Sequence, residues 1–262
     1  MKKTKDKSNK TRKLLIFIVV VLLALGVFTA IAMSPLYEIK EVSASGSEKH
    51  SADEIIRASG VNLGENGFRG IGKNLKYFFS FRNGNAEKLI LEKLPYIEEA
   101  EVKFVIPDKV IIKAVDREPH MLVTCLGAFL LLDKGNYVMD SFKEPVTNHP
   151  VIRGIEFSYY KIGQPLKCNY PDKLGSASKI VDVIAESDKS EKYQILDLVK
   201  GIDIEDSRNI KLFINDTLVV NLGDIKDIEY KITFIKEAYF TNIKDEIGLL
   251  DFTLSKNPTL KR

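Results

Sequence analysis

Residues 94–115 read LPYIEEAEVKFVIPDKVIIKAV, and this stretch sets the fold of the region around it. Apolar and mostly charged residues alternate along residues 100–106, and a second apolar segment follows at residues 110–115. A period of two is typical of a strand that buries one face. Between the two segments, Pro107-Asp108 favours a turn. The stretch therefore predicts a β-hairpin with one face against a hydrophobic core.

Two helices are predicted before the hairpin. The first follows an extended segment at residues 37–44 and begins at Ser51-Ala52-Asp53-Glu54, which has the pattern of a capping box. The second helix is expected to begin at an Asn85 cap and to stop at Pro95. The order strand, helix, helix, strand, strand predicts a small α+β domain over residues 34–118.

Residues 60–84, between these helices, contain six glycines. We expect a long loop with one packed segment. Residues 67–73 have the GxxxxGK spacing of a phosphate-binding loop, but Asn74 stands where such a loop needs Ser or Thr for Mg²⁺, and no buried strand precedes it. A flexible glycine loop is therefore the favoured interpretation. The same segment carries an aromatic patch made of Tyr77, Phe78, Phe79 and Phe81.

The N-terminal region predicts a membrane anchor. Residues 14–33 are uncharged and mostly apolar, and a helix of this length spans about 30 Å, the thickness of a bilayer core. Residues 1–13 carry seven basic side chains and one acidic one, so this tail is expected in the cytoplasm and residues 34–262 on the other side. A cleaved signal peptide is the alternative, because Ala30-Ile31-Ala32 fits a cleavage site. The length of the run and the absence of charge before Glu38 favour an uncleaved anchor.

The net charge of the chain reflects its topology. The whole sequence has 39 basic and 36 acidic residues, and the part after the tail keeps 32 and 35. Basic and acidic residues are interspersed there, so the sequence gives no indication of nucleic-acid binding.

The reactive residue types form no recognisable site. Cys125 and Cys168 lie 43 residues apart without a CxxC motif, so we expect thiols rather than a disulfide. The three histidines, His50, His120 and His149, lack ligand spacing. No nucleophile motif of a hydrolase occurs. We therefore expect no catalytic residue, metal, cofactor or small-molecule substrate.

Residues 119–254 predict a second domain, followed by a tail at residues 255–262. Its helices are expected at 174–185 and 227–239 from their apolar period. A curved, largely antiparallel sheet with helices on one face is expected. Its predicted strands include Tyr193–Leu198, Ile210–Ile214, Leu218–Leu222 and Leu249–Leu254.

The hairpin region resembles a known family. Residues 94–102 (LPYIEEAEV), with Ile106-Pro107 and residues 115–119 (VDREP), are similar to the L-P-x-I-x-x-A-x-V…P-x-x-V-x-I-x-V-x-E-R-x-P run of the FtsQ/DivIB cell-division family. The family's Glu-Arg before the proline appears here as Asp116-Arg117-Glu118. Weaker similarity continues at residues 131–138 and 149–154. The resemblance implies a POTRA domain followed by an FtsQ/DivIB-type β domain.

The resemblance also implies a function. A protein of this family is expected to be a non-enzymatic division protein at the septum, with one membrane span. It would assemble or regulate septal peptidoglycan synthesis through FtsB/DivIC-like and FtsL-like partners, with the septal peptidoglycan synthase as a further candidate partner. The alternatives are a POTRA-bearing secretion or assembly factor and a membrane-tethered cell-wall hydrolase.

The end of the second sheet is the candidate binding site. An uncovered terminal strand presents unpaired N–H and C=O groups, to which an extended partner can add. In the family, this region binds the FtsB/DivIC-type partner. Alternation of Leu250, Phe252 and Leu254 could equally reflect a buried face alone, and the hairpin at residues 100–115 is a second candidate surface. The residues predicted to bind are Asp251, Phe252, Thr253, Leu254, Pro258, Thr259 and Leu260.

Overall fold

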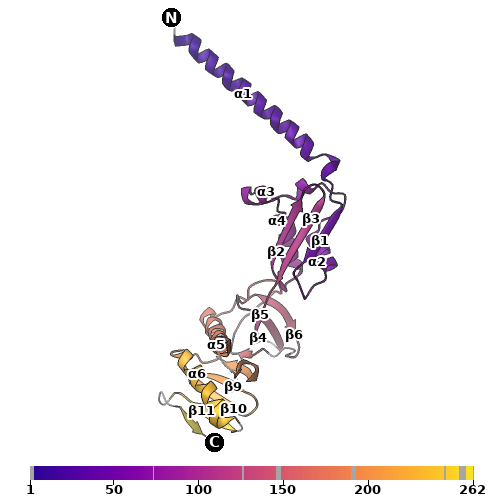
Figure 1. The fold of residues 1–262 in the computed structure, drawn as a ribbon. Helices are drawn as coiled ribbons and strands as arrows, with labels where there is room; N and C mark the ends of the chain where they lie inside the picture. The colour runs from indigo at the N-terminus through magenta and orange to yellow at the C-terminus, as the bar shows by residue number, and fades with distance from the viewer. Residues whose placement is uncertain are drawn as a thin grey trace. The chain divides into compact units, whose positions relative to one another are not determined.

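The protein comprises two compact units, Met1–Asp116 and Arg117–Arg262, each with its own sheet (Figure 1). The computed structural model describes residues 3–72, 74–125, 127–145, 149–189, 193–244, 246–253 and 258–261.

Helix α1 (Lys3–Ala32) contains the predicted membrane span. Its segment Arg12–Ala32 is the only helix among the described residues that is long and apolar enough to cross a bilayer, and none of that segment except its last residue, Ala32, is buried in the protein. Side chains that face lipid are expected to lack protein contacts in this way.

The first unit has the predicted order of strands and helices. Strand β3 (Lys109–Asp116) is central, parallel to β1 (Glu41–Ser45) and antiparallel to β2 (Ile97–Val105). Helices α2 (Ala52–Ser59) and α4 (Gly84–Lys93) pack on one face of this sheet. The alternating burial along β2 and β3 confirms the predicted hairpin.

The helix caps are partly as predicted. Ser51 Oγ accepts the N–H of Glu54 at 3.3 Å, and Glu54 Oε2 accepts the N–H of Ser51 at 2.9 Å, so the capping box of α2 is confirmed. Helix α4 begins earlier than expected, because Asn83, and not Asn85, accepts the N–H of Ala86. Asn85 lies inside the helix.

Residues 60–84 hold more structure than a loop. They contain the 3₁₀ helix η2 (Gly67–Gly70) and the short helix α3 (Leu75–Ser80). A side chain at Gly67 would lie 2.1 Å from the Phe104 ring, so packing requires glycine there. Asn74 caps α3 by accepting the N–H of Lys76 at 3.1 Å. The residue that departs from the phosphate-loop pattern is therefore a helix cap.

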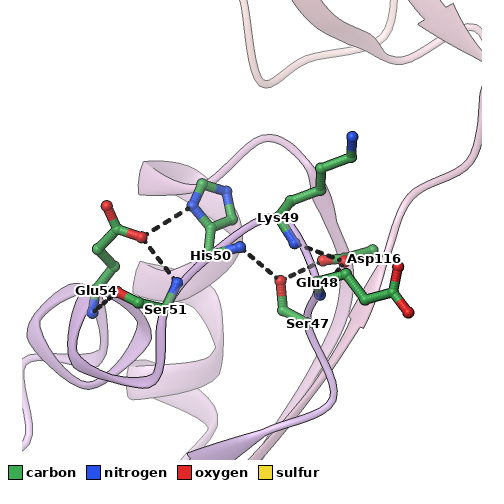
Figure 2. Close-up of polar contacts among 7 residues, drawn as sticks. All are labelled: Ser47, Glu48, Lys49, His50, Ser51, Glu54 and Asp116. Atoms are coloured by element: carbon green, nitrogen blue, oxygen red, sulfur yellow. Dashed lines mark hydrogen bonds and ion pairs between the residues drawn. The ribbon is translucent and has the colours of Figure 1, made fainter.

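Asp116, at the end of β3, holds the turn between β1 and α2 (Figure 2). Its carboxylate accepts the hydroxyl of Ser47 at 2.5 Å and the N–H groups of Glu48 and Lys49 at 2.6 and 3.1 Å. Burial opposes ionisation, but these hydrogen bonds outweigh it and lower the pKa of Asp116. Asp116 therefore has a structural role in this unit.

The second unit contains a mixed sheet in the order β12-β11-β10-β9-β8-β7-β4-β5-β6. Five of the eight neighbouring pairs among its described strands are antiparallel, and three are parallel: β4/β7, β7/β8 and β10/β11. The expectation of a largely antiparallel sheet is thus confirmed, although three parallel pairs make the sheet mixed. The strands are β4 (Pro119–Cys125), β5 (Ala128–Asp133), β6 (Val138–Phe142), β7 (Val151–Arg153), β8 (Val199–Asp203), β9 (Ile210–Ile214), β10 (Leu218–Gly223), β11 (Gly248–Asp251) and β12 (Thr259–Lys261).

Helices α5 (Pro171–Lys189) and α6 (Ile228–Ala238) share one core with the sheet. The π-helical turn η4 (Tyr239–Ile243) extends α6. This core contains one alternating set of strand residues, such as Leu212 and Ile214 in β9, whereas Phe213 is only partly buried. The helices therefore cover a single face, as predicted.

One predicted strand is wrong. Residues 193–198 form no strand, because residues 196–198 are a 3₁₀ turn, η3, and β8 begins only at Val199. The reason is a contact with the end of α5. The Asp188 carboxylate accepts the N–H groups of Ile195 and Leu196 at 2.9 and 2.8 Å, so these groups are not available to a strand ladder.

Candidate protein-binding edge

Strand β12 is the terminal strand of the large sheet. It pairs antiparallel with β11, which in turn lies parallel to β10. The prediction that residues 249–254 form the uncovered strand is therefore wrong, because β12 covers β11. The sequence does not predict β12, because its three residues are too few to show an apolar alternation. Pro258, directly before β12, also favours a break over a strand.

The direction of the backbone groups in β11 follows from its contacts with β10. The N–H of Gly248 donates to the C=O of Thr217 at 3.2 Å, and the N–H of Phe252 donates to that of Asn221 at 3.0 Å. Backbone groups of successive strand residues point to opposite sides. The even-numbered residues of β11 therefore face β10, and the odd-numbered ones face β12.

This direction determines which groups of β12 are free. Leu249 and Asp251 lie opposite Lys261 and Thr259, so these are the pairs that exchange backbone hydrogen bonds. Leu260, between them, then points its N–H and C=O away from β11. In the part of the chain that the structure describes, no strand pairs with this outer side.

The buried carboxylate of Asp251 fastens β12 to the sheet. It accepts the hydroxyl and the N–H of Thr253 at 2.7 and 3.0 Å, and Lys261 Nζ at 3.2 Å. The Thr253 hydrogen bonds and the Lys261 charge lower the pKa of Asp251. Asp251 is therefore an internal support of the edge.

An aromatic strip connects α6 to the end of β11. It consists of Tyr230 and Phe234 on α6 and Phe252 after β11. The Phe234 ring meets Phe252 edge to face at 5.8 Å and lies 6.3 Å from the Tyr230 ring. Tyr230 is 46% exposed, whereas Phe252 is buried in the core. Leu260 is half-buried against the same core.

The predicted site residues take different positions. Leu250, Asp251 and Phe252 are buried. The alternation of Leu250 and Phe252 therefore reflects a buried face, and these side chains are not available to a partner. Thr253 and Thr259 are exposed, Pro258 and Leu260 are half-buried, and Leu254 lies outside the described residues.

Sequence reasoning missed Tyr230, Phe234 and Lys261. The signal for the first two is a second apolar row on α6, four residues apart, beside the buried row of Ile228, Ile232 and Ile235. A helix that packs one face against a core needs only one of these apolar rows. The second row, Tyr230 and Phe234, is therefore a signal for a further contact.

The comparisons with known proteins agree with this architecture. Residues 37–117 match the family model described as POTRA domain, FtsQ-type. The chain is 22% identical to the cell division protein DivIB of Clostridium tetani over 233 residues, covering 86% of this chain and 80% of that protein. It is 24% identical to DivIB of Clostridium botulinum (strain Hall), covering 98% and 93%, and 22% identical to the cell division protein FtsQ of Corynebacterium glutamicum, covering 80% and 81%.

Along most of its length the chain is similar to cell division proteins named DivIB or FtsQ, and its residues 37–117 match the FtsQ-type POTRA model. Its similarity to division proteins extends through both units, so a role in cell division is supported by most of its length.

The hairpin of the first unit does not offer a free strand edge along the middle of β2. The N–H of Asn83 donates to the C=O of Val102, and the N–H of Phe104 donates to that of Phe81, both at 2.8 Å. Residues 81–83 therefore cover the backbone of β2 around residues 102–104, where the second candidate surface is limited to side chains.

A hollow of about 740 Å³ beside α5 is lined by His120 and Asp182, and together with Ser178 these residues have the composition of a hydrolase site. His120 Nε2 lies 3.3 Å from Ser178 Oγ and 4.0 Å from Asp182 Oδ1. In a catalytic triad the base contacts the nucleophile and the acid through different ring nitrogens, whereas here both approach Nε2. Burial lowers the pKa of His120. These three residues lack the geometry of a triad.

The side chains that could bind a metal ion lie apart from one another in the described residues. Among the described residues no three His, Cys, Asp or Glu side chains converge as a metal site. Cys168 is a free, half-buried thiol.

Proposed function

We propose that this protein is a non-enzymatic, membrane-anchored scaffold of the division machinery, and that the outer side of β12 captures an extended segment of an FtsB/DivIC-like partner. An FtsL-like protein would accompany that partner, and the assembly would regulate septal peptidoglycan synthesis. The observation that carries the proposal is the outward-facing backbone of Leu260, held at the end of a nine-stranded sheet.

Strand addition needs such an edge, since the main chain of the partner binds the unpaired N–H and C=O groups. Strand β12 has only three residues, so it can supply few of these bonds. The partner must therefore gain further affinity from side chains. Tyr230 and Phe234, on the helix that contacts Phe252 at the end of β11, supply aromatic contacts of the kind that dominate protein interfaces.

The topology suits this role. The basic tail is the end expected in the cytoplasm, so both folded units would lie outside the membrane, where a bitopic partner also presents its larger part. We propose the division septum as the location.

The test compares Leu260→Pro with Leu260→Ala in the full chain, co-purified with its DivIC-like partner. Proline removes the outward N–H but leaves the β11–β12 hydrogen bonds, because edge strands tolerate proline where the N–H faces solvent. The alanine variant controls for the lost side chain. We expect Leu260→Pro to capture the partner about tenfold less well than Leu260→Ala, the effect of roughly one lost hydrogen bond and poorer strand fit. Equal capture by the two variants would refute strand addition at β12.

The non-enzymatic part has its own test. The full chain, purified in detergent, is incubated with purified peptidoglycan, and released fragments are measured. We expect no release, because the Ser178, His120 and Asp182 side chains do not form a triad. Release that disappears in Ser178→Ala would instead support the hydrolase.

A further inference from the structure

Helix α3 exposes three large apolar side chains to solvent. Leu75 and Phe79 are 72% and 76% exposed, and Phe78 is 47% exposed. The rings of Phe78 and Phe79 contact each other at 5.7 Å. Figure 1 shows α3 standing apart from the sheet of its unit. Contiguous exposed apolar side chains of this kind mark an interaction surface.

The charge around α3 is unlike that of the rest of the exported part. Residues 66–86 contain four basic residues and no Asp or Glu, whereas residues 14–262 as a whole are net acidic. Arg69 and Lys76 are exposed. Aromatic residues next to Lys and Arg are typical of segments that bind the surface of an anionic bilayer.

Contacts tie the start of this segment to the exit of the membrane helix. Asn66 Nδ2 donates to the C=O of Ala32, the last residue of α1, at 2.9 Å. Five residues after Ala32, the ring of Tyr37 meets that of Phe68 edge to face at 4.9 Å. The base of the segment therefore lies at the point where the chain leaves the membrane span.

The end of the segment returns to the same place. The Phe68 ring lies 6.1 Å from that of Phe81, which directly follows α3. The N–H of Gly72 donates to the C=O of Arg82 at 3.0 Å and closes the segment at its base. Helix α3 spans only about 9 Å, so its whole length stays close to the exit of α1.

We propose that α3 is a second membrane contact, in which Leu75, Phe78 and Phe79 enter the headgroup region of the leaflet from which α1 emerges. Arg69 and Lys76 would face the lipid phosphates. The partner is lipid, because α1 already holds the segment at the bilayer, so that binding is effectively intramolecular. This contact would restrict how the first unit tilts on its anchor.

The chain contains no tryptophan, so a single substitution introduces a unique fluorophore. Phe79→Trp in the full chain is reconstituted into nanodiscs of phosphatidylcholine and phosphatidylglycerol. We expect a blue-shifted emission and loss of fluorescence when the lipids carry bromine on their acyl chains. Tyr159→Trp is the matched control, since Tyr159 is 70% exposed in the second unit. Its emission should remain that of water-exposed tryptophan, without quenching.

Two results would overturn the proposal. Emission of Phe79→Trp like that of the control would show that α3 stays in water. A blue shift without quenching by brominated lipid would show that protein, not lipid, covers the helix. Adding Arg69→Glu and Lys76→Glu to Phe79→Trp should reduce the quenching in anionic nanodiscs, and unchanged quenching would contradict the role given to the basic residues.

Discussion

At the scale of single residues, two neighbours in the chain serve different units. Asp116 supports the turn between β1 and α2, whereas Arg117 begins the second unit and pairs with the Asp133 carboxylate there. The Arg117 guanidinium also lies over the Tyr137 ring, 3.9 Å from its centroid. Asp133 accepts the N–H of Tyr137 at 2.7 Å. The pair Asp116-Arg117, which corresponds to Glu-Arg in the family motif, thus has a structural explanation.

Arg117→Ala should destabilise the second unit by about 3–5 kcal/mol, because it leaves the buried Asp133 carboxylate without its cation. Arg117→Lys keeps the charge but loses the planar stack, so its effect should be smaller. Both cysteines of the chain lie in this unit, so thiol labelling along a urea titration reports its unfolding. Lys134→Ala is the control, since the Lys134 side chain is 75% exposed, and it should change little. Equal stability of Arg117→Ala and Lys134→Ala would refute the role of the pair.

Asp251 should make the attachment of β12 sensitive to acid. Its pKa is lowered in the folded protein, so its contribution is complete above the unfolded pKa of about 3.9 and is lost as the pH falls through the folded value. We expect hydrogen-exchange protection of the Thr259 amide, corrected for intrinsic rates, to fall in that range. Asp251→Asn should lower protection already at neutral pH, by roughly 1–3 kcal/mol, and remove the acid dependence. Wild-type protection in that variant would contradict this account.

At the scale of elements, the caps explain where α4 begins. Asn83 accepts the N–H of Ala86 at 3.0 Å, whereas Asn85 is inside the helix. Asn83→Ala should therefore cost about 1 kcal/mol, and Asn85→Ala should be neutral or slightly stabilising, since alanine is the better helix former. Urea unfolding of the first unit, followed by amide signals of β2, measures both. The reverse order of the two variants would show that the helix begins at Asn85.

Elements with a strong local signal could be predicted from the sequence. Alternation predicts β2 and β3 because every second residue contacts the same core, and the Ser51–Glu54 box predicts the start of α2 because both partners lie within one turn. The parallel pairs were missed, although α6 lies between β10 and β11, and a helix between two strands favours parallel pairing. Alternation alone does not distinguish the two directions.

The candidate site could be predicted only in part. Its place at the C-terminal end of the sheet was expected, but the edge itself is β12, which is too short for a periodic signal. The absence of a strand at residues 193–198 depends on Asp188, a side chain in α5 that takes the backbone donors of Ile195 and Leu196. A contact between separate segments leaves no pattern within either one.

At the scale of the whole molecule, the described residues comprise one helix apolar and long enough to span a bilayer, a domain that matches the FtsQ-type POTRA model, and a larger mixed-sheet unit. The proposed contacts are distributed over both units: α3 toward lipid in the first, and β12 with the aromatic strip toward a protein in the second. These two surfaces share no residue. Phe79→Asp should therefore weaken the contact of α3 with lipid without affecting partner capture, and Leu260→Pro should weaken partner capture without affecting the lipid contact.

A fluorescent protein fused to the N-terminus of the full chain should form a ring at midcell. The proposed division scaffold is recruited to the septum, whereas a secretion factor or a tethered hydrolase of general action would distribute over the whole envelope. Time-lapse imaging with a membrane dye as the control measures the enrichment. Uniform membrane fluorescence throughout the cell cycle would contradict a septal role.

The most direct test of strand addition is hydrogen exchange at the Leu260 amide in the full chain, with and without its DivIC-like partner. In the free protein, the Thr259 and Lys261 amides face β11 and should be protected, whereas that of Leu260 faces outward and should exchange freely. Binding should protect Leu260 and leave its two neighbours nearly unchanged. A saturated complex in which the Leu260 amide still exchanges freely would contradict capture at β12.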